Sequence, residues 1–131
     1  MEIIKLEKNY ILQNHSFFNN KINLFFQNYD IKNHITNTDF YQINWKNEFA
    51  GFFNIYEKNR IQKFFIIPKF QHKGLGSLAV KYILSFIKNP YCFVKKSNQN
   101  GISFWKKNNF IITSDLGNIL KLDYKLRLTL L

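Results

Sequence analysis

The chain has 131 residues, of which 46% are hydrophobic and 18% aromatic, enough for one domain with a substantial core. A formal net charge of +11 favours anionic ligands, and the single cysteine, Cys92, excludes an internal disulfide and a cysteine-based zinc site. The N-terminus lacks a signal-peptide pattern and no apolar run reaches the length of a membrane span. We expect one domain over residues 1–131 of a cytoplasmic protein, with no membrane contact and no metal.

The positive charge has two possible origins. Of the 19 basic residues 17 are Lys, and the accompanying excess of Asn, Ile and Phe is typical of an AT-rich coding sequence. Surfaces that recognise nucleic acids usually rely on Arg for bidentate contacts. A nucleic-acid partner is therefore possible but not favoured.

The first part of the chain predicts short strands followed by a helix. Residues 2–7 and 10–12 are strand-like pieces. Apolar residues at helical spacing predict a first helix from Ser16 to Tyr29, with Ser16 as its N-cap. The polar segment 30–38 is expected to be a loop or a ragged short helix.

The middle of the chain predicts three strands. Phe40–Trp45 and Glu48–Tyr56 are rich in aromatic residues and are separated by Lys46-Asn47, the pattern of a β-hairpin. Ile61–Ile67 is the third strand.

Helices and strands alternate in the remainder. We expect a helix from Leu75 that stops at Asn89-Pro90, a strand Tyr91–Val94, a helix Asn98–Asn108, and strands Phe110–Thr113 and Ile119–Leu128 around a tight turn at 115–118. The order β-α-βββ-α-β-α-ββ predicts an α+β (α/β three-layer) fold around one mixed sheet.

The run from Gln71 to Ser77 carries the strongest functional signal. It joins a strand to a helix, and Gly74 and Gly76 allow positive φ and close approach of a ligand to the main chain. Backbone N–H groups and the helix dipole favour an anion there. The run is neither a P-loop nor a three-glycine dinucleotide fingerprint, but it predicts a phosphate or pyrophosphate site.

Two motifs of this chain resemble those of the GNAT superfamily of N-acetyltransferases. The first is the acetyl-CoA motif Gln/Arg-x-x-Gly-x-Gly/Ala after an apolar pair and a proline, here Ile66 to Gly76. The second is Asn-x-x-Ala-x-x-Leu-Tyr-x-x-x-Gly-Phe. Its counterparts are Asn98, Gly101, Phe104, Trp105, Asn109 and Phe110, with Gly101 for Ala, Trp105 for Tyr and Asn109 for Gly. The resemblance covers roughly residues 40–130.

The resemblance implies a fold, a cofactor and its contacts. The fold would be a mixed, mostly antiparallel sheet of about 6–7 strands with 3–4 helices, splayed between the fourth and fifth strands. The cofactor would be acetyl-CoA. Its contacts would be the backbone of Phe64, Phe65 and Ile66 for the pantetheine arm and acyl carbonyl, the motif residue Gln71, the main chain of His72, Lys73, Gly74, Leu75, Gly76 and Ser77 for the pyrophosphate, and Asn98 for the pantetheine.

The catalytic acid and base are not identified by the resemblance. Trp105 stands where relatives often place a Tyr, and indole does not donate a proton at a useful pKa. Arg60 and Phe93 occupy strand positions where relatives sometimes carry a carboxylate. Weak candidates are Glu48, Tyr41 and Tyr124, followed by Tyr91, Glu57, Asp39, His15 and His34. Cys92 is expected to be a buried, inert thiol.

The resemblance therefore implies an acyl-CoA-dependent N-acyltransferase that passes acetyl from acetyl-CoA to a primary amine by direct transfer in a ternary complex. The acceptor would be a small molecule, a peptide or protein amine, or aminoacyl-tRNA, and the protein a monomer or homodimer. Two alternatives remain open: a non-catalytic CoA-binding or interaction module, and a toxin-like acetylase of aminoacyl-tRNA. The tight turn 115–118 and the short segment 30–38 leave the acceptor side open.

Overall fold

A mixed sheet organises the computed structural model, which describes residues 1–125. Its strands run in the order β1-β2-β3-β4-β5-β7-β6, and every neighbouring pair is antiparallel except β4 and β5. The strands are β1 (Glu2–Leu6), β2 (Thr38–Trp45), β3 (Glu48–Tyr56), β4 (Arg60–Ile66), β5 (Tyr91–Lys95), β6 (Phe110–Asp115) and β7 (Ile119–Tyr124). The predicted mixed, mostly antiparallel sheet is confirmed.

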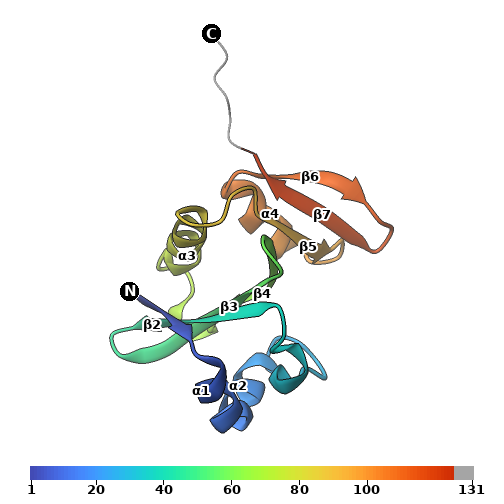
Figure 1. Ribbon diagram of the computed structural model, residues 1–131. Helices are drawn as coiled ribbons and strands as arrows, with labels where there is room; N and C mark the ends of the chain where they lie inside the picture. Colours follow the sequence, from blue (N-terminus) through green and yellow to red (C-terminus); the bar gives the residue numbers. More distant parts are fainter. Residues whose placement is uncertain (126–131) are drawn as a thin grey trace.

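Helices cover both faces of this sheet (Figure 1). The helices are α1 (Lys8–Gln13), α2 (His15–Ile22), the 3-10 turn η1 (Ile31–His34), the 3-10 turn η2 (Pro68–Phe70), α3 (Leu75–Leu84) and α4 (Gln99–Lys107). The first face, under α1, α2 and η1, involves β1 to β4, whereas α3 and α4 pack on the opposite face. None of the helices within residues 1–125 is long and apolar enough to cross a membrane.

The two hydrophobic cores meet across β3. Phe52 belongs to the core under α2 and Phe53 to the core under α3, and both side chains are fully buried. Successive side chains of a strand point to opposite faces, so β3 is nearly all apolar because both of its faces are covered. Burying each such ring stabilises the fold by about 1.5–3 kcal/mol.

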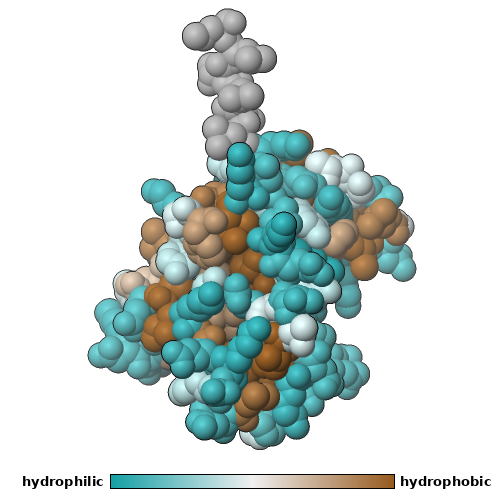
Figure 2. All heavy atoms as spheres, viewed as in Figure 1, coloured by the Kyte–Doolittle hydropathy of each residue, from teal (hydrophilic) through white to brown (hydrophobic). Residues whose placement is uncertain are grey.

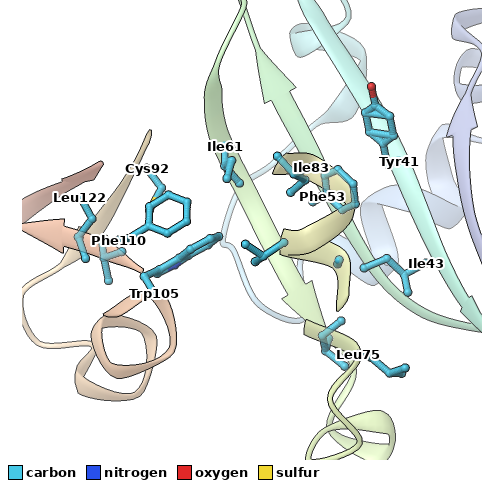
Figure 3. Packing of buried hydrophobic residues seen from close by; sticks show 14 of the residues in the cluster. Tyr41, Ile43, Phe53, Ile61, Leu75, Ile83, Cys92, Trp105, Phe110 and Leu122 are labelled. Atoms are coloured by element: carbon cyan, nitrogen blue, oxygen red, sulfur yellow. The ribbon is translucent and has the colours of Figure 1, made fainter. Parts of the chain in front are cut away.

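The sheet splits between β4 and β5. These parallel strands pair only at Arg60↔Tyr91 and Ile61↔Cys92, after which they diverge. The side chain of Trp105 points from α4 into this gap toward β4 (Figure 3), and its ring centroid lies 5.1 Å from that of Phe64. The predicted splay between the fourth and fifth strands is confirmed.

The N-terminal prediction is wrong in two places. Residues 10–12 are not a strand but lie in α1. The helix expected over Ser16–Tyr29 starts one residue earlier, at His15, and ends seven residues earlier, at Ile22. Beyond it the side chain of Asn23 donates to the Tyr29 carbonyl (2.9 Å) and accepts from the Tyr29 N–H (3.0 Å), which closes residues 23–29 into a loop.

The remaining elements agree with expectation apart from their ends. Lys46 and Asn47 form the hairpin turn with φ of 50° and 65°, and segment 30–38 contains η1. The helix α3 ends at Leu84, five residues before Asn89. At this end the Ser85 hydroxyl donates to the Tyr82 carbonyl (2.6 Å). The last strand is described as far as Tyr124, and residues 126–128 of its prediction lie outside the described residues.

Candidate functional site

The glycine turn presents uncapped donors at the start of α3. Gly74 occupies the N-cap position at φ 79°, and no side chain caps the helix. The N–H groups of Leu75, Gly76 and Ser77 belong to the first turn of the helix, where intrahelical acceptors are lacking. A Cβ on Gly74 would meet nothing within 4 Å, so the space beside this residue is open. Leu75, only 1% exposed, anchors the turn in the core.

The turn is tied to β4 and to α4. The Gln71 Nε2 donates to the carbonyl of Ile66 (2.9 Å), which links the motif residue to the end of the strand. A Cβ on Gly76 would lie 2.9 Å from a ring atom of Phe104, so α4 contacts α3 where only hydrogen fits. His72, at φ 64°, and Lys73 are exposed on the outer part of the turn.

The edge of β4 that faces the gap carries free backbone donors. The Lys63 N–H donates to the Asn54 side chain (2.7 Å) and the Ile67 N–H to the Ala50 carbonyl (2.8 Å), so both point toward β3. Backbone direction alternates along a strand, and the N–H groups of Phe64 and Ile66 therefore point toward the gap. The Phe65 N–H points to β3, so of the three predicted contact residues only two offer an N–H on this side.

Asn98 stands at the N-cap of α4. Its Oδ1 accepts from the Gly101 N–H (2.9 Å), while its side-chain amide is exposed. A Cβ on Gly101 would lie 2.5 Å from Asn98 Nδ2, so this capping geometry explains Gly where the motif has Ala. Asn109 sits at φ 70°, which explains why it replaces Gly at the end of the same motif.

Trp105 lies beside these groups, on the α4 side of the gap. It is 6% exposed, and its ring packs edge-on against Phe64 and, at 4.8 Å, against Phe110. Tyr124 contacts Phe110 at 5.7 Å from the far side of that ring. The structure thus brings Trp105 and Tyr124 into one aromatic cluster on the α4 side of the gap.

Most of the other acid–base candidates lie elsewhere. Tyr41 stacks on Phe53 at 4.8 Å beneath α3, and burial, the main cause, raises its pKa to about 12. Glu48 is exposed and pairs with Lys69 at 3.3 Å, and Asp39 pairs with Lys5 at 3.7 Å. None of these groups is placed at the gap. Of the remaining candidates, His34 stacks on Tyr29, Glu57 is in a turn and His15 begins α2. Tyr91 pairs with Arg60 where β4 and β5 meet, and its ring lies under Lys121.

Cys92 and the surface hollows do not extend the site. The Cys92 thiol is buried, and this burial raises its pKa to about 12. Two surface hollows of about 300 and 420 Å³ border β1, and neither is lined by the glycine turn or β4. Within residues 1–125 no group of His, Cys, Asp or Glu side chains is placed to hold a metal.

Sequence reasoning did not single out Lys63. In a regular strand Arg60 and Lys63, three residues apart, would point to opposite faces. A β-bulge at Gln62 shifts the register between β3 and β4. Both basic side chains therefore reach the α2 side of the gap. The bulge is visible only from the pairing of β3 with β4, which the sequence alone does not give.

The comparisons with known proteins agree with one another. The family model "Acetyltransferase (GNAT) family" matches residues 6–110. Similar structures include a GNAT family acetyltransferase from Elizabethkingia anophelis with acetyl-CoA bound (TM-score 0.73, 16% identity, 95% of this chain and 97% of that chain). Another is spermidine N-acetyltransferase from Vibrio cholerae with CoA and spermine (TM-score 0.69, 16% identity, 93% of each chain). A third is Arabidopsis thaliana Naa50 with a bisubstrate analogue, CoA-Ac-MVNAL (TM-score 0.69, 15% identity, 95% of this chain and 98% of that chain).

At these identities the likeness to solved structures shows the fold alone. No curated protein sequence matches the chain.

Proposed function

We propose that this chain, which belongs to the GNAT acetyltransferase family, is an N-acetyltransferase that moves acetyl from acetyl-CoA to a primary amine within a ternary complex. One observation carries the proposal. Two sets of backbone donors, the uncapped first turn of α3 and the edge of β4 that faces the gap, are tied to each other by the Gln71–Ile66 hydrogen bond. The first set would bind an anion, and the second lies along the gap of the sheet.

The start of α3 suits the pyrophosphate of CoA. First-turn N–H groups and the helix dipole together favour negative charge by about 0.3–1 kcal/mol at an exposed helix end. The space beside Gly74, the residue before these donors, is open. Lys73, exposed beside them, adds a positive charge.

The edge of β4 suits the pantetheine arm and the acetyl carbonyl. The Phe64 and Ile66 N–H groups would hold them, and the exposed Asn98 amide would contact the arm from α4. Acetyl-CoA would supply the acetyl group as an activated thioester. Donors fixed on a strand stabilise negative charge on a carbonyl oxygen without having to reorganise.

The proton balance of the transfer needs no acid from this chain. The amine nitrogen bonds to the acetyl carbon, the carbon–sulfur bond breaks, and the proton lost by nitrogen passes to water or to the leaving sulfur. Trp105 cannot donate a proton, and the Tyr41 hydroxyl is buried with a raised pKa. We infer direct attack with deprotonation through water.

A non-catalytic CoA-binding module is the second candidate, favoured by Trp105 in place of a proton donor. Calorimetry with CoA, followed by assay of thiol release from acetyl-CoA with a panel of amines, separates the two. An enzyme binds CoA and releases thiol with at least one amine, whereas a module binds CoA and turns over none. Absence of CoA binding would overturn both candidates.

A further inference from the structure

The split between β4 and β5 has side chains on its α2 face as well as on its α3 face, and several of those on the α2 face are basic. The Arg60 guanidinium lies 4.7 Å from the centre of the Phe93 ring, and the Lys63 ammonium lies 4.6 Å from the centre of the Phe26 ring. Lys95 ends β5, two residues after Phe93 and so on the same face. These three residues, which we call the basic cluster, flank the gap from both strands.

The members of the basic cluster are close enough to influence one another. The pKa of Lys63 is lowered, first by burial and then by the charges of Arg60 and Lys95. A fold keeps three cations together at some cost, because like charges repel and burial removes water from the charged form. An anion placed among them would remove that cost.

No carboxylate within residues 1–125 forms an ion pair with the basic cluster. The four ion pairs found within residues 1–125 involve Lys5, Lys69, Lys96 and Lys121, and none involves the cluster. The Nε of Arg60 is buried without a hydrogen-bond partner among the described residues. The cations rest on aromatic rings instead, and a ring face leaves the terminal N–H donors of Arg60 and Lys63 available to a ligand.

An apolar surface adjoins the cluster on the same face. Phe25 stacks on Phe65 with ring centroids 4.3 Å apart, and 36% of its surface is exposed. The Phe26 ring that carries Lys63 also contacts Phe65. A ligand seated here would meet positive charge and aromatic carbon together.

We propose that the acceptor is an amine that carries an oxyanion, a carboxylate or phosphate, next to an apolar group. This inference rests on the proposed function, because it assigns the α2 side of the gap to the acceptor. The basic cluster would bind the oxyanion and repel a polyamine. Its positive field would also disfavour the ammonium form of the acceptor, which yields the neutral nucleophile without a carboxylate base.

Matched acceptors test the charge requirement. Thiol release from acetyl-CoA is measured with phenylalanine, phenylalaninamide, phenethylamine and spermidine. We expect kcat/KM for phenylalanine to exceed that for the two neutralised analogues by about tenfold or more, with spermidine poorest. Equal or better use of the amide, phenethylamine or spermidine would overturn the proposal and leave the acetyltransferase function intact.

A second experiment, with phenylalanyl-tRNA as acceptor, distinguishes a carboxylate from a phosphate as the oxyanion. Acetylation of free phenylalanine supports a carboxylate. Acetylation of phenylalanyl-tRNA alone supports a phosphate, provided that it depends on Lys63. If phenylalanyl-tRNA is acetylated equally well when Lys63 or Arg60 is replaced, the proposal is contradicted.

Variants of the cluster give the control. Lys63→Met is expected to lower kcat/KM for the anionic acceptor about tenfold and that for phenethylamine less than threefold. Lys121→Met removes a lysine from the same face, but one already paired with Asp123 at 3.8 Å, and should leave both values unchanged. An equal loss for both acceptors in Lys63→Met would mean that Lys63 acts only through structure.

A binding measurement keeps the proposal testable if no acceptor is turned over. N-acetylphenylalanine and N-acetylphenylalaninamide are titrated into the CoA-loaded protein by NMR. We expect the carboxylate to bind more tightly than the amide in the wild type, and this preference to vanish in Lys63→Met. Binding of the carboxylate no tighter than the amide would overturn the proposal, whatever the assay of turnover shows.

Discussion

The ring of Phe104 touches the backbone of Gly76, so that a Cβ at this position would stand 2.9 Å and 3.1 Å from two ring atoms. The contact joins the two motifs of the chain, one at the start of α3 and the other on α4. The same ring lies 5.5 Å from Phe64 of β4. Gly76 thereby allows α4 to close on the gap where the donor edge of β4 is exposed.

Gly76→Ala should reveal this contact through a double-mutant cycle with Phe104→Leu. In the wild-type background the new methyl displaces the ring, and we expect the free energy of unfolding to fall by about 1 kcal/mol. In the Phe104→Leu background the ring atoms are absent. The better helix propensity of Ala should then raise the free energy of unfolding by up to about 1 kcal/mol. Chemical denaturation of the four proteins measures the coupling; additive effects would mean that the ring moves freely.

Much of the fold follows from local patterns in the sequence. The hairpin at Lys46-Asn47, the glycine turn and most of the succession of strands and helices along the chain were predicted because turn chemistry and apolar spacing act over a few residues. The loop closed by Asn23 was missed, since a single side chain that binds a backbone six residues away overrides helical spacing. The spacing of apolar residues carries no information about such a hydrogen bond.

The two sides of the candidate site differ in how far they could be predicted. The proposed cofactor side depends on consecutive residues around Gly74, which a motif captures. The proposed acceptor side depends on the bulge at Gln62 and on residues of β5 and the α2 region that meet only after folding. Arg60 was recognised merely as a missing carboxylate, whereas the structure places it beside Lys63.

Asn98 is expected to act both as helix cap and as ligand contact, and two substitutions separate these roles. Asn98→Ala removes the acceptor for the Gly101 N–H and should lower the free energy of unfolding by about 1 kcal/mol. Asn98→Ser keeps a neutral capping oxygen but loses the amide donor. We expect near-normal stability and weaker CoA binding, measured by calorimetry; normal binding in Asn98→Ser would restrict Asn98 to capping.

Cys92 should make stability fall in alkaline solution. Its pKa is raised from 9.0 to about 12 in the folded protein, so between these values the unfolded chain releases a proton that the folded chain retains. Unfolding is then favoured as pH rises from about 9, and the contribution is intact below that pH. Cys92→Val should reduce the fall in the free energy of unfolding between pH 9 and pH 10. Urea unfolding at a series of pH values measures this fall. An unchanged slope would contradict burial of the thiol.

Trp105 is expected to matter for packing more than for chemistry. Trp105→Ala leaves a void between Phe64 and Phe110 and should cost about 3–5 kcal/mol of unfolding free energy. Trp105→Phe should keep thiol release within about threefold, because no proton transfer is assigned to the indole. Trp45→Phe, outside the gap, is the control. A far larger loss of turnover in a folded Trp105→Phe protein would give the indole N–H a catalytic contact.

The buried amide of Asn54 ties stability to the choice of acceptor. Its Oδ1 accepts from the Lys63 N–H (2.7 Å), and its Nδ2 donates to the Tyr29 hydroxyl and to Gln62 Oε1, each at 3.2 Å. These bonds hold the bulge that brings Lys63 to the face of Arg60. Asn54→Leu fills a similar volume but leaves the buried donor of Lys63 unpaired, at a cost of about 1–3 kcal/mol.

With the bulge released, Lys63 should leave the basic cluster, and the preference for phenylalanine over phenethylamine should fall about as far as in Lys63→Met. Tyr29→Phe removes one partner of Asn54 but spares the bond to Lys63. We expect it to lower stability by about 1 kcal/mol and to retain the preference. If Asn54→Leu loses stability yet keeps the full preference, the bulge does not position Lys63 for the acceptor.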